Sequence, residues 1–229
     1  EIEGMWRTQS LNGGWGYYDF AHKSFPPSGM IATPFTTAAV LEGLKHAQEA
    51  GFPVDQQRID FALHFLEMCR SPGRSYIYSW GHAKRPYGQA NDVRGAIGRN
   101  QSGEYALVAW DRINRDQIDL AFDDFFYHHN FIECGRGRQY PHEAWFATAP
   151  YYYLFGHYYA ACNLAYASDE KRPEYAQQLG EIISKIQEDD GAIWDYPLYD
   201  YTKAYGTGYG ALILGHCLAS TTGSEVSPR

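Results

Sequence analysis

The chain has 229 residues, enough for one large domain with a substantial buried core. Its formal net charge of −8 argues against nucleic acid as a partner, because a phosphate-binding surface is positively charged. No stretch approaches the run of roughly 18 apolar residues that a membrane-spanning helix needs, so we expect no membrane span.

The hydrophobic spacing predicts helices and almost no strands along the chain. Thr33 and Pro34 mark the start of one helix, since Pro is tolerated in a first turn, and Gly51 and Pro53 end it. In chain order, the predicted helices cover residues 35–49, 54–69, 103–113, 116–132, 142–166, 173–186 and 205–219. We expect a single domain over residues 1–221, followed by a flexible tail over residues 222–229.

A turn with glycine and an aromatic residue recurs four times, with a period of about 60 residues that has room for two helices. The copies lie at residues 12–18, 72–78, 135–140 and 190–196. One helix of a pair is more apolar: residues 144–166 are apolar or aromatic nearly all round, whereas residues 173–186 have a charged face. The pattern predicts an all-α fold of repeated helical hairpins that form a partial or complete α/α toroid, with an ordinary helical bundle as the alternative.

Two of these turns share a Gln followed by a Gly and a Trp, at Gln9, Gly13 and Trp15 and at Gln187, Gly191 and Trp194. They resemble the QW repeats of the squalene and oxidosqualene cyclase family. The chain therefore resembles the α/α-toroid domains of terpene cyclases and protein prenyltransferases. The resemblance implies that the Gln and the Trp tie the end of an outer helix to the turn before the next inner helix.

The catalytic motifs of those families do not accompany the resemblance. The cyclases protonate their substrate with an Asp-x-Asp-Asp motif, and the nearest run here, at residues 187–190, reads Gln-Glu-Asp-Asp. The Asp, Cys and His that hold zinc in protein prenyltransferases have no matching arrangement. The chain also ends after about three and a half hairpins, short of the six in a closed toroid. We expect a portion of a longer parent chain, an open half-ring, or a ring completed by an oligomer.

Aromatic residues make up 17% of the chain, with 20 Tyr, 12 Phe and 6 Trp. Tyr and Trp combine an apolar ring with a polar group, so an excess of them often lines a cavity or a binding face. A tyrosine-rich core with hydrogen-bonded hydroxyls accounts equally well for the excess. Both interpretations stay open on the sequence alone.

The four cysteines are scattered singly, without a CxxC pair. Cys69, Cys162 and Cys217 lie in helical, apolar contexts, where a free Cys is usually a small core residue. His216 adjoins Cys217 inside a hydrophobic helix, which favours core packing over metal ligation. We therefore expect no metal site and no cofactor, and the sequence indicates no particular compartment.

Polar residues gather near the predicted starts of the inner helices, which would converge at one mouth of a ring. Helix N-termini favour anions, so this mouth could bind carboxylate or phosphate groups. The expected ligand-binding residues are Arg94, Arg99, Arg136, Arg138, Trp145, Asp195 and Tyr201. The same polar set includes Asp19, His22, Asn100, Glu104 and Asp200. Arg136 and Arg138 could hold a substrate carboxylate bidentately. Alternatively, they could balance the negative charge of acidic residues on the surface.

The residues expected to be catalytic are His142, Glu143 and Tyr205. A His beside a carboxylate can act as general acid or base near neutral pH, which singles out His142 and Glu143 as a pair. The alternative is that these two residues cap the start of the following helix. His157, inside the most apolar predicted helix, is expected to be a hydrogen-bonded core residue.

Three functions remain open at this point. The first is a toroid domain that binds a bulky, partly apolar ligand in an aromatic-lined concave centre, without an assigned activity. The second is an enzyme on the same scaffold, which converts an isoprenoid or cleaves a uronate-containing polysaccharide by elimination. For the elimination, Tyr205 or His142 would abstract the proton, and Arg136 or Arg138 would neutralise the carboxylate. The third is a structural or protein-interaction module. The expected partner is therefore a small molecule, an oligosaccharide or another protein.

Overall fold

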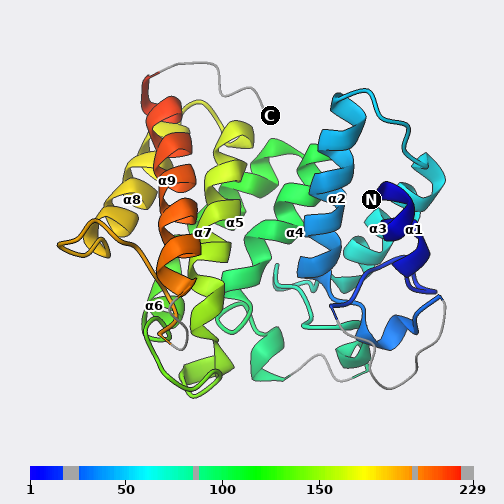
Figure 1. Ribbon diagram of the computed structural model, residues 1–229, viewed down its shortest axis with the longest axis horizontal. Helices are drawn as coiled ribbons and strands as arrows, with labels where there is room; N and C mark the ends of the chain where they lie inside the picture. The colour runs from blue at the N-terminus through cyan, green and yellow to red at the C-terminus, as the bar shows by residue number, and fades with distance from the viewer. Residues whose placement is uncertain (18–25, 85–87, 198–200, 223–229) are drawn as a thin grey trace.

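A computed structural model describes residues 1–17, 26–84, 88–197 and 201–222 of the protein (Figure 1). Over these residues the chain is all-α, and no β-strand occurs among them. The all-α class predicted from the hydrophobic spacing is therefore confirmed. None of the helices in the described ranges is long and apolar enough to cross a membrane.

The described residues form nine α-helices and six short 3₁₀ helices. The α-helices are α1 (Ile2–Thr8), α2 (Pro34–Glu49), α3 (Gln56–Cys69), α4 (Ile97–Ala109), α5 (Arg115–Tyr127), α6 (His129–Glu133), α7 (Tyr153–Asn163), α8 (Arg172–Lys185) and α9 (Tyr201–Thr222). The 3₁₀ helices are η1 (Gly29–Ile31), η2 (Trp80–His82), η3 (Gln89–Asn91), η4 (Trp145–Ala147), η5 (Pro150–Tyr152) and η6 (Leu164–Tyr166).

Four of the helices form a row in which α2 packs on α4, α4 on α7, and α7 on α9 (Figure 1). The other helices cover this row: α3 packs against α2 and α4, α5 against α4, and α8 against α9 and α7. In the sequence, α4 follows the covering helix α3, α7 follows α5, and α9 follows α8, so the chain is a helical repeat. In Figure 1, α2 and α9 lie at opposite ends of the row.

Helix α4 occupies the middle of the row, and all of its residues are buried. Its polar side chains therefore need partners within the protein. Glu104 accepts two hydrogen bonds from Arg70, at 2.9 and 3.0 Å, and Asn163 of α7 donates to the side-chain oxygen of Gln101 at 2.8 Å. Arg99, in the first turn of α4, is an exception, because its Nη1 has no hydrogen-bond partner.

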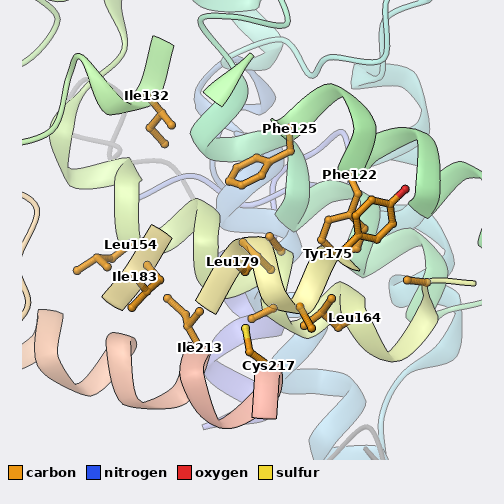
Figure 2. Close-up of a cluster of buried hydrophobic side chains, with 14 of the residues drawn as sticks. Phe122, Phe125, Ile132, Leu154, Leu164, Tyr175, Leu179, Ile183, Ile213 and Cys217 are labelled. Atoms are coloured by element: carbon orange, nitrogen blue, oxygen red, sulfur yellow. The ribbon is translucent and has the colours of Figure 1, made fainter. Parts of the chain in front are cut away.

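The two halves of the row are held by separate hydrophobic clusters that meet at α4. One cluster joins α5, α7, α8 and α9, and Figure 2 shows Phe122, Leu154, Leu179 and Ile213 converging in it. The other is built by α1–α4 and the turns between them, with Trp15 among its buried residues. Helix α4 contributes to both clusters, so it connects the two halves.

The repeated turn has the same hydrogen bonds in its first and last copies. The amide of Ser10 donates to the Gly14 carbonyl at 2.8 Å, and the amide of Glu188 donates to the Ala192 carbonyl at 2.9 Å. In both copies the preceding Gln side chain donates to the carbonyl of a glycine four residues later, at 2.9 and 3.1 Å. Those glycines have φ of 92° and 83°, a conformation that favours glycine.

A hydroxyl on the following helix completes each of these turns. The amide of Trp15 donates to Thr37 Oγ1 of α2 at 2.9 Å, and the amide of Ile193 donates to Thr207 Oγ1 of α9 at 3.0 Å. The second copy follows the same plan with different residues, because the amide of Tyr76 donates to Asn100 Oδ1 of α4 at 3.2 Å. These turns therefore fix where each helix of the row begins.

Several predicted helix boundaries are wrong. The predicted helix over 142–166 is interrupted by two 3₁₀ turns, and α7 starts only at Tyr153. The predicted helix over 116–132 breaks at His128, which separates α5 from α6. Helix α4 begins at Ile97 rather than at residue 103, because its first turns carry buried polar residues that hide the apolar spacing. The pattern also missed the short helix α1.

Candidate functional site

The segment that leads into η4 and includes it, residues 142–147, contains an unusual concentration of strained backbone. Of five non-glycine residues with positive φ among those described, three lie close together here: His142 at 66°, Phe146 at 60° and Ala147 at 57°. Such conformations cost free energy and persist only where the surroundings impose them. Here the ring of His142 donates from Nδ1 to the Ala147 carbonyl at 2.7 Å, and the guanidinium of Arg94 lies 4.0 Å from the Phe146 ring.

A cavity of about 270 Å³ lies beside this segment. We call it the Arg99 pocket, and it is lined by Tyr78, His82, Ala90, Gly95, Arg99, His142, Ala147, Ala149 and Tyr152. One wall comes from residues 78–82 and 90–99, and the other comes from residues 142–152, which end just before α7. The two walls are far apart in the sequence and meet only in the fold.

Arg99 is the most unusual group in this pocket. Its side chain is almost completely buried, with 3% of the residue exposed. Nη2 donates to the Ala90 carbonyl at 2.5 Å, but Nη1 is buried without a hydrogen-bond partner, and Arg99 makes no ion pair with any described residue. Burial lowers the pKa of Arg99 from its usual value, although arginine keeps its charge in proteins. An unpaired buried charge weakens a fold, so folding alone gives no reason for it.

Aromatic rings surround the guanidinium of Arg99. Its central carbon lies 5.0 Å from the ring centre of Tyr78, 5.7 Å from that of Tyr152 and 5.9 Å from that of Phe35. The negative faces of these rings stabilise the cation in part, but they do not neutralise it. The pocket therefore combines a fixed positive charge with apolar and aromatic walls.

Two histidines at the pocket have a defined hydrogen-bonding pattern. Because His142 Nδ1 must donate to the Ala147 carbonyl, its Nε2 is left to accept a hydrogen bond from Tyr151 Oη at 3.3 Å. His82 Nδ1 lies 3.2 Å from Asn91 Oδ1 and donates to it in the same way. Burial raises the pKa of Tyr151 to about 12, so its hydroxyl stays protonated at neutral pH.

Gly95 allows the two walls to approach each other. A side-chain carbon at this position would lie 2.7 Å from the Phe146 carbonyl oxygen and would also clash with the Gln89 carbonyl. Backbone atoms cannot move aside as a flexible side chain can, so glycine is required here. The shape of the Arg99 pocket depends on this contact.

A second cavity, of about 420 Å³, lies beside the same segment. It is lined by Asn130, Phe131, Cys134, Arg138, Glu143, Ala144 and Trp145. Trp145 is 75% exposed, and Arg138 Nη1 lies 3.8 Å from Glu143 Oε1. The charges of this second pocket thus compensate each other, in contrast to the Arg99 pocket.

The structure brings together some of the residues that the sequence singled out and separates others. Arg99 and His142 line one pocket, whereas Arg138, Glu143 and Trp145 line the second. His142 and Glu143 therefore do not form a side-chain pair at a single pocket. Their local backbone is a strained turn, so they do not cap a helix start either.

Other predicted site residues support the fold around the pockets. Arg94 pairs with Asp92 at 2.7 Å and stacks on Phe146. Arg136 pairs with Glu133 at 3.4 Å. Glu104 and Asn100 hold Arg70 and the amide of Tyr76, as described above.

Asp195 and Tyr205 join α9 to α7. Tyr205 Oη donates to Asp195 Oδ1 at 2.5 Å, and Asp195 Oδ2 accepts from the Leu154 amide in the first turn of α7 at 3.1 Å. Burial raises the pKa of Asp195, and these hydrogen bonds oppose that shift. Tyr201 begins α9, but its side chain lies outside the described part of the structure, as do Asp19, His22 and Asp200.

The sequence did not single out Tyr78, His82, Tyr151 or Tyr152. The two tyrosines of η5 were hidden in an aromatic run that was interpreted as one buried helix. Tyr78 ends the second copy of the repeated turn, and that position was the available signal. Among the described residues, no group of three or more His, Cys, Asp or Glu could hold a metal ion.

No family model matches this chain, and no match was found among curated proteins or solved structures. The function of the protein must therefore be inferred from its pockets.

Proposed function

We propose that this protein is a ligand-binding helical-repeat domain, built like the α/α toroids of terpene cyclases and prenyltransferases, that takes a partly apolar anionic ligand in the Arg99 pocket. The observation that carries this proposal is the buried, unpaired guanidinium of Arg99. A bound anion would supply the charge that the protein itself lacks at this point. The rings of Tyr78 and Tyr152 would contact the apolar part of the ligand.

The arrangement of helices and turns supports the toroid-like part of this proposal. Alternating row and covering helices, and a turn stabilised by a Gln side chain at both ends of the chain, are what such a repeat would require. A toroid of this kind offers a concave centre, and the missing acid and zinc motifs favour binding without those chemistries.

The test is a ligand screen by thermal shift and native mass spectrometry. Isoprenoid diphosphates, squalene-like lipids, acidic oligosaccharides and small organic acids would be compared on the wild type and on Arg99→Met. We expect one anionic class to raise the melting temperature of the wild type and to leave the variant unchanged. Arg112→Met is the matched control, because Arg112 pairs with Glu67 at the surface, at 2.8 Å. Stabilisation that persists in Arg99→Met would refute a site at this pocket.

The hydrogen bond between Tyr151 and His142 favours a second candidate function, elimination across a uronate-containing saccharide. With the carboxylate at Arg99, His142 Nε2 would accept the neighbouring carbon-bound proton, and the released electron pair would form a carbon–carbon double bond. The carbon–oxygen bond would break, and the Tyr151 hydroxyl would protonate the leaving oxygen. His142→Ala and Tyr151→Phe should then abolish formation of the ultraviolet-absorbing unsaturated product while binding persists. The absence of that product with every acidic saccharide tested would exclude this candidate.

A further inference from the structure

The geometry of the Arg99 pocket points to a narrower class of ligand: we propose a small monocarboxylic acid whose body is a flat, largely apolar ring. This inference rests on the proposed function and names the ligand class for the same pocket. Three observations carry it, namely the charge of the pocket, its free donor and the chemistry of its walls.

The charge of the pocket matches a single negative charge. None of its lining residues is Asp or Glu, and Arg99 is the one lining residue with a permanent charge. His142 and His82 each use Nδ1 to donate to an oxygen, which leaves Nε2 as an acceptor in the neutral ring. A carboxylate would therefore neutralise the pocket. A phosphate monoester carries close to two negative charges at neutral pH and would leave one of them uncompensated.

The free donor suits a planar acceptor. Nη1 of Arg99 carries two N–H groups and has no partner among the described residues, while Nη2 already donates one hydrogen to Ala90. A carboxylate at Nη1 would accept parallel N–H groups from the guanidinium edge. Because the guanidinium is enclosed by rings, a carboxylate bound there brings its substituent against Tyr78 and Tyr152.

The walls limit the body of the ligand. Ala90, Ala147 and Ala149 have no side chain beyond a methyl group, and Tyr78 and Tyr152 contribute aromatic rings, which favour stacking. The cavity of about 270 Å³ is smaller than the roughly 300–1,000 Å³ of pockets for drug-sized ligands. A single ring with a carboxylate fits these limits, whereas an extended lipid does not.

Equilibrium binding to four simple probes tests this inference on the intact chain. Titration calorimetry and ligand-observed NMR would compare benzoate with benzamide, which lacks the charge, acetate, which lacks the ring, and phenyl phosphate, which carries more charge. We expect benzoate to bind at least about tenfold more tightly than each of the others, the ratio that about 1.4 kcal/mol produces. Binding should be lost in Arg99→Met and in Ala90→Leu, which fills the cavity but keeps the charge, and retained in Arg112→Met.

The outcomes separate the two proposals. Tighter binding of phenyl phosphate, lost in both pocket variants, would overturn the carboxylate class and leave ligand binding at the Arg99 pocket intact. Equal binding of benzamide would overturn the role of charge. Benzoate binding that survives in both pocket variants, or no benzoate binding at all, would overturn the inference. The broader screen on Arg99→Met then decides the proposed function separately.

Discussion

Among single residues, Arg99 lowers the stability of the fold, because burying its charge costs free energy that its neighbours only partly offset. The side chain is buried, three rings face it, and no carboxylate among the described residues pairs with it. Residues that bind or react are often kept at the expense of stability, because the site must stay unsatisfied until the ligand arrives. Arg99 is the residue in this chain to which that argument applies most directly.

Replacing Arg99 with Met should not destabilise the ligand-free protein. Removing an unpaired buried charge and retaining apolar volume is commonly neutral or stabilising by about 1–4 kcal/mol, and the lost hydrogen bond to Ala90 reduces that gain. We expect the free energy of unfolding from urea titration to equal or exceed that of the wild type. A loss of more than about 2 kcal/mol would mean that Arg99 is a structural residue.

His157 is a core residue that makes stability depend on pH. It is fully buried, and its Nδ1 donates to the Tyr153 carbonyl at 2.7 Å, which confirms the expectation of a hydrogen-bonded core histidine. Its Nε2 lies 2.9 Å from Nε2 of His129, so His129 donates to it and the His157 ring is neutral. Burial lowers the pKa of His157 to about 3 and also lowers the pKa of His129.

The sign of the resulting pH dependence follows from these shifts. Below pH 6.5 the unfolded chain takes up protons that the folded protein does not, so stability is full above this pH. Stability is then lost as pH falls toward about 3, the folded pKa of His157. Each histidine contributes a slope of up to about 1.4 kcal/mol per pH unit. We expect His157→Gln to flatten the urea-derived stability curve between pH 6.5 and 4. An unaltered slope in His157→Gln would contradict a neutral, buried His157.

At the scale of elements, the repeated turn fixes the start of three helices of the row. In the first copy the accepting hydroxyl, on Thr37, is fully buried, whereas the equivalent Thr207 in the last copy is exposed. Water can replace the hydroxyl only where the turn is accessible. The hydrogen bond to the hydroxyl should therefore contribute more to the free energy of unfolding in the first copy than in the last.

Thr37→Val and Thr207→Val test that difference with one isosteric change. At Thr37 the substitution leaves the Trp15 amide buried without an acceptor, which costs about 1–3 kcal/mol. At Thr207 we expect a loss below about 1 kcal/mol, because Thr207 is exposed and its hydrogen bond to the Ile193 amide is only partly buried. Chemical denaturation of both variants measures the loss in the free energy of unfolding. Equal losses would show that burial does not determine how much this hydrogen bond contributes to stability.

Helices α4 and α7 approach each other closely through glycine. A side-chain carbon added at Gly156 would lie 2.9 Å from the Gly98 Cα, and one added at Gly98 would lie 2.7 Å from the Tyr152 Cβ. These are contacts with backbone or with the first carbon of a side chain, so neither can be relieved by a rotamer change. Since Tyr152 also lines the Arg99 pocket, the helix contact helps to position that wall.

Gly156→Ala should destabilise the protein by about 1–3 kcal/mol through overpacking. Gly43→Ala is the matched control, because Gly43 lies in α2 with no atom within 4 Å of an added side-chain carbon. Helix propensity alone should make the control more stable by about 1 kcal/mol. Melting temperatures of the two variants should therefore move in opposite directions, and a stabilised Gly156→Ala would contradict the close contact.

At the scale of the whole molecule, α4 ties the two halves together. It is buried along its full length and belongs to both hydrophobic clusters. Trp6, Trp15, Trp80 and Trp110 pack in or against the cluster of α1–α4, so tryptophan fluorescence reports mainly on that half. Far-ultraviolet circular dichroism reports on helices of both halves.

We expect both signals to follow one cooperative unfolding transition with the same midpoint, as for a single domain. Loss of either half would expose one face of α4 together with its polar side chains, which disfavours a half-folded state. Urea titration monitored by both signals is the measurement. Separate midpoints would show that the halves are independent units and would contradict the single domain expected over residues 1–221.

Spacing and composition were enough to predict the helical class, the repeated turn, and the burial of His157 and of three of the four cysteines. These features follow from local spacing: apolar residues recur at the helical period, and glycines mark the positions that need positive φ. A helix after each turn could be predicted in the same way, because the turn and the helix are neighbours in the chain.

Which polar residues line a common pocket depends on the packing of distant segments, and spacing could not predict it. Arg99 and His142 lie 43 positions apart in the chain (142 − 99) and meet because the segment around Gly95 packs on the strained segment around Phe146. The adjacent residues His142 and Glu143 face different pockets because the backbone there leaves helical geometry. Neither fact is contained in periodicity or spacing, since both depend on contacts between distant segments and on backbone conformations that only the surrounding packing imposes.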